Sequence, residues 1–237
     1  MFRAVAAEVA AAQERSPGAA PAVLDVGGGS GAWAVQLARL GCAVTVVDHS
    51  PNALAALQRR AREAGVAELV TAVQGDVDAL ADVVPCGGAD LVLGHGLLEV
   101  VDDAVAAVGA LAAASRPGGA VSVLVTGRLA AVLARTVAGR LAEALALLTD
   151  PDGRLGEHDG VRRRLDAEPL RLLLTEAGLD VELLQGDGVL ESWVPGSARD
   201  DGPAAGLVTE LEALGAGEPG LLAVAPRLHA LARRRAG

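Results

Sequence analysis

The sequence predicts an α/β fold in which a mostly parallel sheet is covered by helices on both faces. Short apolar runs alternate with helical patterns through the first half of the chain, which is the order expected of a parallel sheet. Hydrophobic residues make up 51% of the 237 residues, enough to bury one substantial core. We therefore expect a single domain over 1–237.

The first half supplies five strands and the helices between them. The predicted strands are 22–26, 43–48, 69–73, 90–93 and 120–125. The predicted helices are 33–40, 51–64, 77–84 and 102–115. Ser50 and Pro51 suit the N-cap and first turn of the second helix, and Arg116-Pro117-Gly118-Gly119 predicts a turn before the fifth strand.

The pattern changes after the fifth strand. A long helical stretch at 129–148, broken near Gly139, precedes a helix at 167–177, a strand at 180–184, a weak helix at 204–214 and a last edge strand at 227–233. Residues 126–166 are predicted to form a cap insertion over the carboxyl edge of the sheet, where open α/β sheets bind ligands. Arg233–Arg235 are expected to form a frayed terminus.

Composition excludes some function classes. Twenty basic and thirty acidic residues give a net charge of −10, a poor overall match for nucleic acid. The chain lacks Lys, Ile and Tyr, so the core must be built from Leu, Val and Ala, and the coding bias indicates a GC-rich bacterial source. We find no run long enough to span a membrane, no signal peptide and no metal-ligand spacing, and expect a cytoplasmic protein without membrane or metal partners.

The most informative segment is the glycine loop that follows the first strand. Asp25, Gly27, Gly29 and Gly31 form an Asp-x-Gly-x-Gly-x-Gly pattern, and such a loop lets a ligand approach backbone N–H groups at a helix start. Gly27 and Gly29 with the later Asp48 also fit a dinucleotide-binding fingerprint. One hypothesis for the glycine loop is therefore the dinucleotide site of an NAD-dependent oxidoreductase.

Asp25 distinguishes a site for a dinucleotide from a site for a cofactor that has no phosphate. A carboxylate at the mouth of the loop would repel a pyrophosphate but suits a ligand with an ammonium group. S-Adenosylmethionine carries an α-amino group and a sulfonium and has no phosphate. The pattern thus favours adenosylmethionine as the cofactor.

Further residues fall where a nucleoside needs them. Asp48 ends the second strand and suits both ribose hydroxyls. Gly75, Asp76 and Val77 follow the third strand, where a carboxylate and a backbone N–H suit adenine. His95 lies beyond the fourth strand, as a cofactor contact, a catalytic proton acceptor or a structural histidine.

Taken together, these residues resemble the class I adenosylmethionine-dependent methyltransferases, most closely the bacterial group that contains the tRNA carboxymethoxyuridine methyltransferase. The shared stretches are 24–29, 47–50, 91–102 and 116–119. The resemblance implies a Rossmann-like sheet of seven strands, mostly parallel with an antiparallel edge strand, and a helical cap. The cofactor contacts it implies are Arg3, Gly27, Gly28, Asp48 with its neighbour His49, the 74–77 loop and His95.

The methyl acceptor is predicted from charge. Arg162, Arg163 and Arg164 lie in the expected cap, and guanidinium groups suit carboxylate and phosphate. We expect them to bind an anionic, carboxylate-bearing acceptor, either a small acid or a modified tRNA nucleoside, with a solvated charged face as the alternative. Trp193 either lines the acceptor pocket or fills core.

Three function hypotheses follow from these observations. The favoured one is an adenosylmethionine-dependent methyltransferase. The others are an NAD-dependent oxidoreductase and a non-catalytic, cofactor-binding partner subunit. The sequence does not identify the acceptor, the kind of atom that is methylated or the oligomeric state.

Overall fold

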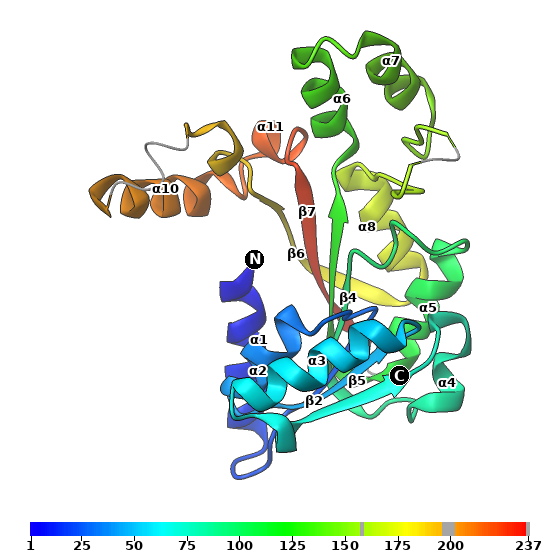
Figure 1. Ribbon diagram of the computed structural model, residues 1–237, viewed down its shortest axis with the longest axis vertical. Coiled ribbons are helices and arrows are strands. Elements are labelled where there is room, and N and C mark those ends of the chain that lie inside the picture. Colours follow the sequence, from blue (N-terminus) through cyan, green and yellow to red (C-terminus); the bar gives the residue numbers. More distant parts are fainter. Residues whose placement is uncertain (157–158, 196–201, 236–237) are drawn as a thin grey trace. The chain divides into compact units, whose positions relative to one another are not determined.

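The computed structural model describes residues 1–156, 159–195 and 202–235 (Figure 1). By its internal contacts the chain divides into two compact units. The first unit comprises Met1–Val123, Leu173–Glu182 and Leu231–Gly237, and the second comprises Leu124–Leu172 and Leu183–Ala230. The second unit contains the predicted cap and also 183–230, where the sequence predicted a weak helix, the start of the last strand and a pocket or core role for Trp193. A single domain with a cap at 126–166 stays a prediction.

The structure contains a seven-stranded mixed sheet, which confirms the predicted fold class. Each of the seven strands has residues in the first unit. The strand order is β3-β2-β1-β4-β5-β7-β6, and the β1–β2, β1–β4 and β2–β3 ladders are parallel. The sheet is mostly parallel and includes antiparallel strands. Helices accompany it in the alternating order that the sequence predicted.

The elements have the following bounds. The strands are β1 Ala22–Val26, β2 Ala43–Asp48, β3 Val70–Gln74, β4 Ala89–His95, β5 Ser115–Thr126, β6 Leu179–Asp187 and β7 Arg227–Arg234. The helices are α1 Phe2–Arg15, α2 Ala32–Arg39, α3 Pro51–Glu63, α4 Leu80–Val83, α5 Ala104–Ala114, α6 Arg128–Val137, α7 Leu141–Thr149, α8 Ala167–Glu176, α10 Gly202–Gly215 and α11 Pro219–Leu222. Short 3₁₀ helices are η1 Ala67–Leu69, η2 Val77–Ala79 and η3 Glu191–Trp193.

The core of the first unit is aliphatic, as the composition required. Its strands β1, β2 and β4 bury nearly every side chain, and most of these are Val and Leu. Ser50 caps α3 by accepting a hydrogen bond at Oγ from the Ala53 N–H at 3.3 Å, with Pro51 in the first turn. This rigid half of the sheet fixes the loops at the ends of β1 and β2.

Two predictions about the ends of strands are wrong. The turn expected at 116–119 belongs to β5, where Arg116 pairs with Asp90 of β4 at 2.7 Å. The last strand, β7, lies between β5 and β6 and not at the edge, because its run Leu228–Ala232 is fully buried and needs neighbours on both sides.

The arginines expected in a frayed terminus are also ordered. Arg233 lies in β7 and pairs with Glu8 of α1 at 2.8 and 2.9 Å and with Glu182 of β6 at 2.6 and 3.0 Å. Arg234 donates to the carbonyl of Ala113 at 3.0 Å. Paired carboxylates and carbonyls therefore hold the end of the chain in the sheet.

The N-terminal helix α1 is the main element that the sequence analysis missed. It buries Val5, Val9 and Ala12 along one face, and the Glu8–Arg233 pair ties it to β7. A run of alanines between few apolar residues gave only a weak periodic signal. Its first residue, Phe2, nevertheless contributes to the site described below.

The second unit contains a helical hairpin formed by α6 and α7 (Figure 1). The two helices are separated at Gly139, whose φ is +73°, so the break predicted there is confirmed. Arg128, the first residue of α6, donates from Nε to Asp166 at 2.9 Å and from Nη1 to the Leu148 carbonyl at 3.1 Å. These bonds anchor both helices at their base.

Candidate active site

The glycine loop between β1 and α2 is held by the end of β2. The Gly27 N–H donates to the Val47 carbonyl at 2.8 Å, and the Gly29 N–H donates to Oδ2 of Asp48 at 2.9 Å. Gly27, Gly29 and Gly31 all have positive φ, between +55° and +79°, which L side chains rarely adopt. The three glycines of the pattern are thus required by the backbone.

Gly28 is required for a different reason. A Cβ placed there would lie 2.5 Å from Oδ2 of Asp25 and 2.8 Å from Cγ1 of Val46. The loop backbone therefore lies directly against the Asp25 carboxyl group. A larger residue at position 28 would push the loop off the strand end.

Asp25 is a buried carboxyl group whose Oδ2 has no hydrogen-bond partner among the described residues. Only 2% of the residue is exposed, and burial, reinforced by the nearby charge of Asp48, raises its pKa to about 7. Leaving such an oxygen unsatisfied is costly. A buried acid at a glycine loop fits a ligand that brings its own cationic N–H donors.

Asp48 joins the loops that follow β1 and β2. Its Oδ1 accepts from the Ser50 N–H at 2.8 Å while Oδ2 accepts from Gly29, and the residue is 8% exposed. The adjacent His49 is exposed, with its Nδ1 3.9 Å from Oδ1 of Asp48. A carboxylate has about four lone-pair sites, so Asp48 keeps capacity for further donors such as ribose hydroxyls.

The loop after β3, which contains the residues predicted to bind adenine, lies beside Asp48. The Gly75 N–H donates to the Asp48 carbonyl at 3.2 Å. Asp76 is exposed and caps η2 through the Asp78 N–H at 3.4 Å, whereas Val77 is buried. Asp25 and Asp48 therefore lie in the last residues of β1 and β2, and the 75–77 loop follows the neighbouring strand β3.

His95 ends β4 and is held in an aromatic cluster. Its Nε2 lies 2.8 Å from Oγ of Ser122, a fully buried residue of β5, and its Nδ1 is buried. The Trp33 ring meets it edge-on at 4.9 Å, and Phe2 stacks on Trp33 at 5.7 Å. In this arrangement the His95 ring packs against Trp33 and bonds to Ser122. Proton transfer by His95 stays a prediction.

Two of these partners were missed from the sequence, and one left a signal. Ser122 interrupts an apolar strand, and a polar residue inside a buried strand needs a partner. Phe2, by contrast, lies in the unrecognised helix α1. Its neighbour Arg3 is exposed, and a cofactor contact by Arg3 stays a prediction.

The three arginines predicted to bind the acceptor differ in environment. Arg164 is 5% exposed and donates to both carboxylate oxygens of Asp159, at 2.6 and 3.2 Å, and to the Gly153 carbonyl at 2.8 Å. It therefore organises its own loop. Arg162 is exposed and Arg163 half-buried, so acceptor binding by the cluster now depends on these two.

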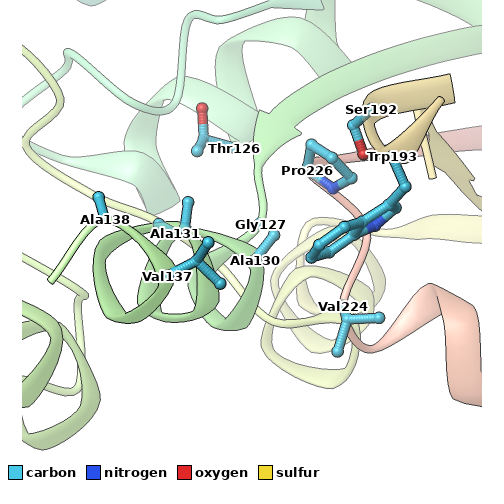
Figure 2. Close-up of a pocket in the computed structure, with 11 residues that line it drawn as sticks. Thr126, Gly127, Ala130, Ala131, Val137, Ala138, Ser192, Trp193, Val224 and Pro226 are labelled. Atoms are coloured by element: carbon cyan, nitrogen blue, oxygen red, sulfur yellow. The ribbon is translucent and has the colours of Figure 1, made fainter. Parts of the chain in front are cut away.

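The second unit contains an apolar pocket of about 530 Å³. Figure 2 shows Trp193 on one side and Ala131 and Val137 of α6 on the other. The pocket is lined by Thr126, Gly127, Ala130, Ala131, Ala134, Val137, Ala138, Ser192, Trp193, Val224 and Pro226. No lining residue is charged. Trp193 lines this pocket and is not part of the buried core.

Two absences concern the residues that the structure describes. None of their helices is long and apolar enough to cross a membrane. Their His, Cys, Asp and Glu side chains form no group of three that could hold a metal ion.

The fold and the loop geometry define the class. Residues 23–119 match the family model described as "Methyltransferase domain", and the sheet has the class I arrangement. The chain therefore has the class I methyltransferase fold, whose cofactor is S-adenosylmethionine.

More specific relatives are methyltransferases by name, and their names refer to different pathways or substrates. The chain is 34% identical over 164 residues to a ubiquinone biosynthesis O-methyltransferase of Xanthomonas axonopodis pv. citri, over 69% of this chain and 64% of that protein. Magnesium protoporphyrin IX methyltransferase of Synechocystis PCC 6803, solved with adenosylhomocysteine, has a TM-score of 0.60 and 15% identity, covering 98% of this chain and 82% of that one.

A third relative limits what the fold can say. The [4+2]-cyclase SpnF also has a TM-score of 0.60, with 20% identity over 99% of this chain and 83% of that one. Its name describes a cyclisation and not a methyl transfer. The fold therefore does not by itself specify the reaction.

Proposed function

We propose that the chain transfers a methyl group from S-adenosylmethionine to a hydroxyl oxygen of a small, largely apolar acceptor. The observation that carries the proposal is Asp25, a buried acid without a partner at Oδ2 beside the glycine loop. It suits the α-amino group of adenosylmethionine and opposes the pyrophosphate of NAD. The oxidoreductase is accordingly disfavoured.

The roles of the cofactor residues follow from their positions. Asp25 would pair with the ammonium group, Asp48 with the ribose hydroxyls, and Asp76 with the Val77 N–H would recognise adenine. The N–H groups of Gly27, Gly29 and Gly31 already bond within the protein, so the loop N–H groups that would face the ligand at the start of α2 are those of Gly28 and Ser30. His49, Arg3 and His95 would flank it.

When bound, the cofactor supplies a methyl carbon that is already activated by a sulfonium. The chain's part is to position the acceptor oxygen for in-line attack and to exclude water, and positioning alone can provide much of the acceleration. As the oxygen–methyl bond forms, the bond from that carbon to sulfur breaks and its electron pair stays on sulfur. The acceptor hydroxyl passes its proton to His95, the predicted proton acceptor, or to solvent.

The acceptor is inferred from the pocket of the second unit. An uncharged lining disfavours a buried carboxylate, because an ion left without a partner there would pay its desolvation cost. The pocket is lined by the small side chains of Ala130, Ala131 and Ala134 and by the aromatic ring of Trp193, a combination that leaves room for an acceptor ring and offers it a stacking partner. The Xanthomonas relative, an O-methyltransferase by name, supports oxygen as the methylated atom.

The earlier prediction of an anionic acceptor is the second candidate. It depends on Arg162 and Arg163, which lie outside the pocket lining. A small acid or a tRNA nucleoside gripped by these two side chains would be methylated without entering the apolar pocket.

One set of measurements separates these possibilities. Calorimetry should detect adenosylhomocysteine binding and no NAD binding, and mass spectrometry should detect methylation of apolar phenols but not of small acids or tRNA. An Ala131→Leu/Ala134→Leu variant should lose most turnover of the phenol, whereas Arg162→Gln/Arg163→Gln should keep it. The reverse result would favour the anionic acceptor, and cofactor binding without any turnover would favour a non-catalytic subunit.

A further inference from the structure

A row of exposed leucines runs along one face of α7. Leu141, Leu145 and Leu148 follow the i, i+4, i+7 spacing that places side chains on one helix face, and each is more than half exposed. The side of α7 that packs is different, and it buries Ala144 and Leu147. The leucine row is therefore not part of the core of the second unit.

The neighbouring helix α6 extends this apolar surface. None of its ten residues is buried. Val137, at its end, is 77% exposed and also lines the pocket. The exposed surface and the pocket thus share a residue, and we call Val137 with Leu141, Leu145 and Leu148 the hairpin patch.

The segment 128–164, which contains the hairpin patch, has a charge opposite to that of the whole chain. Residues 128–164 carry seven arginines against five carboxylates, whereas the rest of the chain carries thirteen basic residues against twenty-five carboxylates. Arg140 and Arg154 are more than half exposed although they pair with Glu143 and Asp152, and Arg162 is exposed. Exposed leucines combined with arginines are characteristic of helices that lie on anionic lipid surfaces.

A second helix provides a comparison within the same unit. On α10, Leu207, Leu211 and Leu214 have the same spacing and similar exposure. Residues 202–215 carry two glutamates and no basic residue, so an anionic surface would repel that helix. The two leucine rows differ mainly in the charge that accompanies them.

We propose that the hairpin patch docks on an anionic lipid bilayer surface, with its leucines in the headgroup region and the arginines of 128–164 at the phosphates. No membrane partner was predicted from the sequence because no segment is long enough to span a bilayer, but adsorption to the surface of a bilayer needs no spanning segment. The pocket shares Val137 with the patch, so an apolar acceptor dissolved in the bilayer would meet the pocket at the membrane. Docking itself does not depend on the proposed function.

The test is cosedimentation of the full chain with vesicles, without cofactor or acceptor. We expect binding to vesicles of phosphatidylcholine with 30% phosphatidylglycerol, and at least tenfold weaker binding to pure phosphatidylcholine. Leu141→Ser/Leu145→Ser/Leu148→Ser should reduce binding at least tenfold. Arg140→Gln/Arg154→Gln/Arg162→Gln should also weaken it and remove most of its salt dependence.

The matched control is Leu207→Ser/Leu211→Ser/Leu214→Ser on α10, which should leave vesicle binding unchanged. Circular dichroism and adenosylhomocysteine binding confirm that each variant is folded. The proposal is overturned if wild type does not bind anionic vesicles at low salt, or if both leucine variants lose binding equally. Self-association that only the α7 variant abolishes, without vesicle binding, would instead assign the patch to a second copy of the chain.

Discussion

The glycine loop of the first unit and the pocket of the second unit would recognise their proposed ligands by opposite means. The loop has two buried carboxyl groups beside its backbone: Asp25, whose Oδ2 has no partner among the described residues, and Asp48, which accepts from the N–H groups of Gly29 and Ser50. The pocket uses Ala, Val, Pro and one Trp, with no charged side chain in its lining. A polar site is specified by a few residues of fixed type, whereas an apolar site is specified by shape, which many sequences provide.

The largest effect should come from Asp48→Ala. Losing two ribose hydrogen bonds to a carboxylate, each worth about 1.5 kcal/mol, corresponds to an affinity loss of about 100-fold for adenosylhomocysteine. Calorimetry with this ligand and its 2′-deoxy analogue is the measurement. Wild type should prefer the ribose form, and a variant that retained that preference would contradict the assigned role.

Asp25→Asn should separate function from stability. Its folded pKa of about 7 exceeds the unfolded value of 3.8, so between pH 4 and 7 the folded state keeps a proton that the unfolded state releases. Stability therefore falls as pH rises through that window and is level above it. At pH 8 the variant should be more stable than wild type by about 1–3 kcal/mol, yet bind adenosylhomocysteine about tenfold more weakly.

Denaturant unfolding of the ligand-free protein at pH 5 and pH 8 measures this gain. A variant that was destabilised equally at both pH values would indicate that the Asp25 carboxyl group is needed for folding and not held for a ligand.

His229 in the second unit should show the opposite pH dependence. Burial lowers its pKa to about 4, and the Gln185 amide donates to its Nδ1 at 3.0 Å, which requires the neutral ring. Between pH 6.5 and 4 the unfolded state binds a proton that the folded state does not, so stability falls as pH decreases. His229→Gln should remove about 1–2 kcal/mol of that loss.

Asp25 and His229 therefore have opposite effects on the pH dependence of stability between pH 4 and 6.5. Replacing one of them should reveal the slope of the unfolding free energy against pH that the other produces. Comparing the unfolding free energies of wild type, both single variants and the double variant at four pH values would test this. Parallel curves for the two single variants would be inconsistent with it.

The smallest effect should come from Trp193→Ala. A stacked pair of rings is worth about 0.5–1.5 kcal/mol in addition to the apolar surface area that it buries. The loss of this stacking predicts a three- to tenfold loss of acceptor affinity. Adenosylhomocysteine affinity should not change. An equal loss of both affinities would show that the two sites do not act separately.

The same contrast explains what the sequence could predict. The bounds of β1 and β2 were predicted to the residue, because β-branched runs end at glycines or at a capped helix. Ser50 and the break at Gly139 were likewise predicted from backbone chemistry. The loop acids could be proposed as cofactor contacts because few residue types can bind an ammonium group or two ribose hydroxyls.

The failures have physical causes as well. The position of β7 inside the sheet depends on long-range pairing that local patterns do not encode. Arg164 looked like a ligand-binding residue because a sequence does not show its partner Asp159. The pocket was missed, apart from Trp193, because alanines and valines in a pocket resemble those in any core.

The scarcity of aromatic residues has an optical consequence. With no tyrosine in the chain, absorbance near 280 nm and ultraviolet emission come from Trp33 and Trp193. Trp33 contacts His95 in the first unit, and Trp193 lines the pocket of the second. Each half of the molecule therefore contains one natural chromophore, and replacing either tryptophan by phenylalanine leaves an intrinsic fluorescence signal that reports on one site alone.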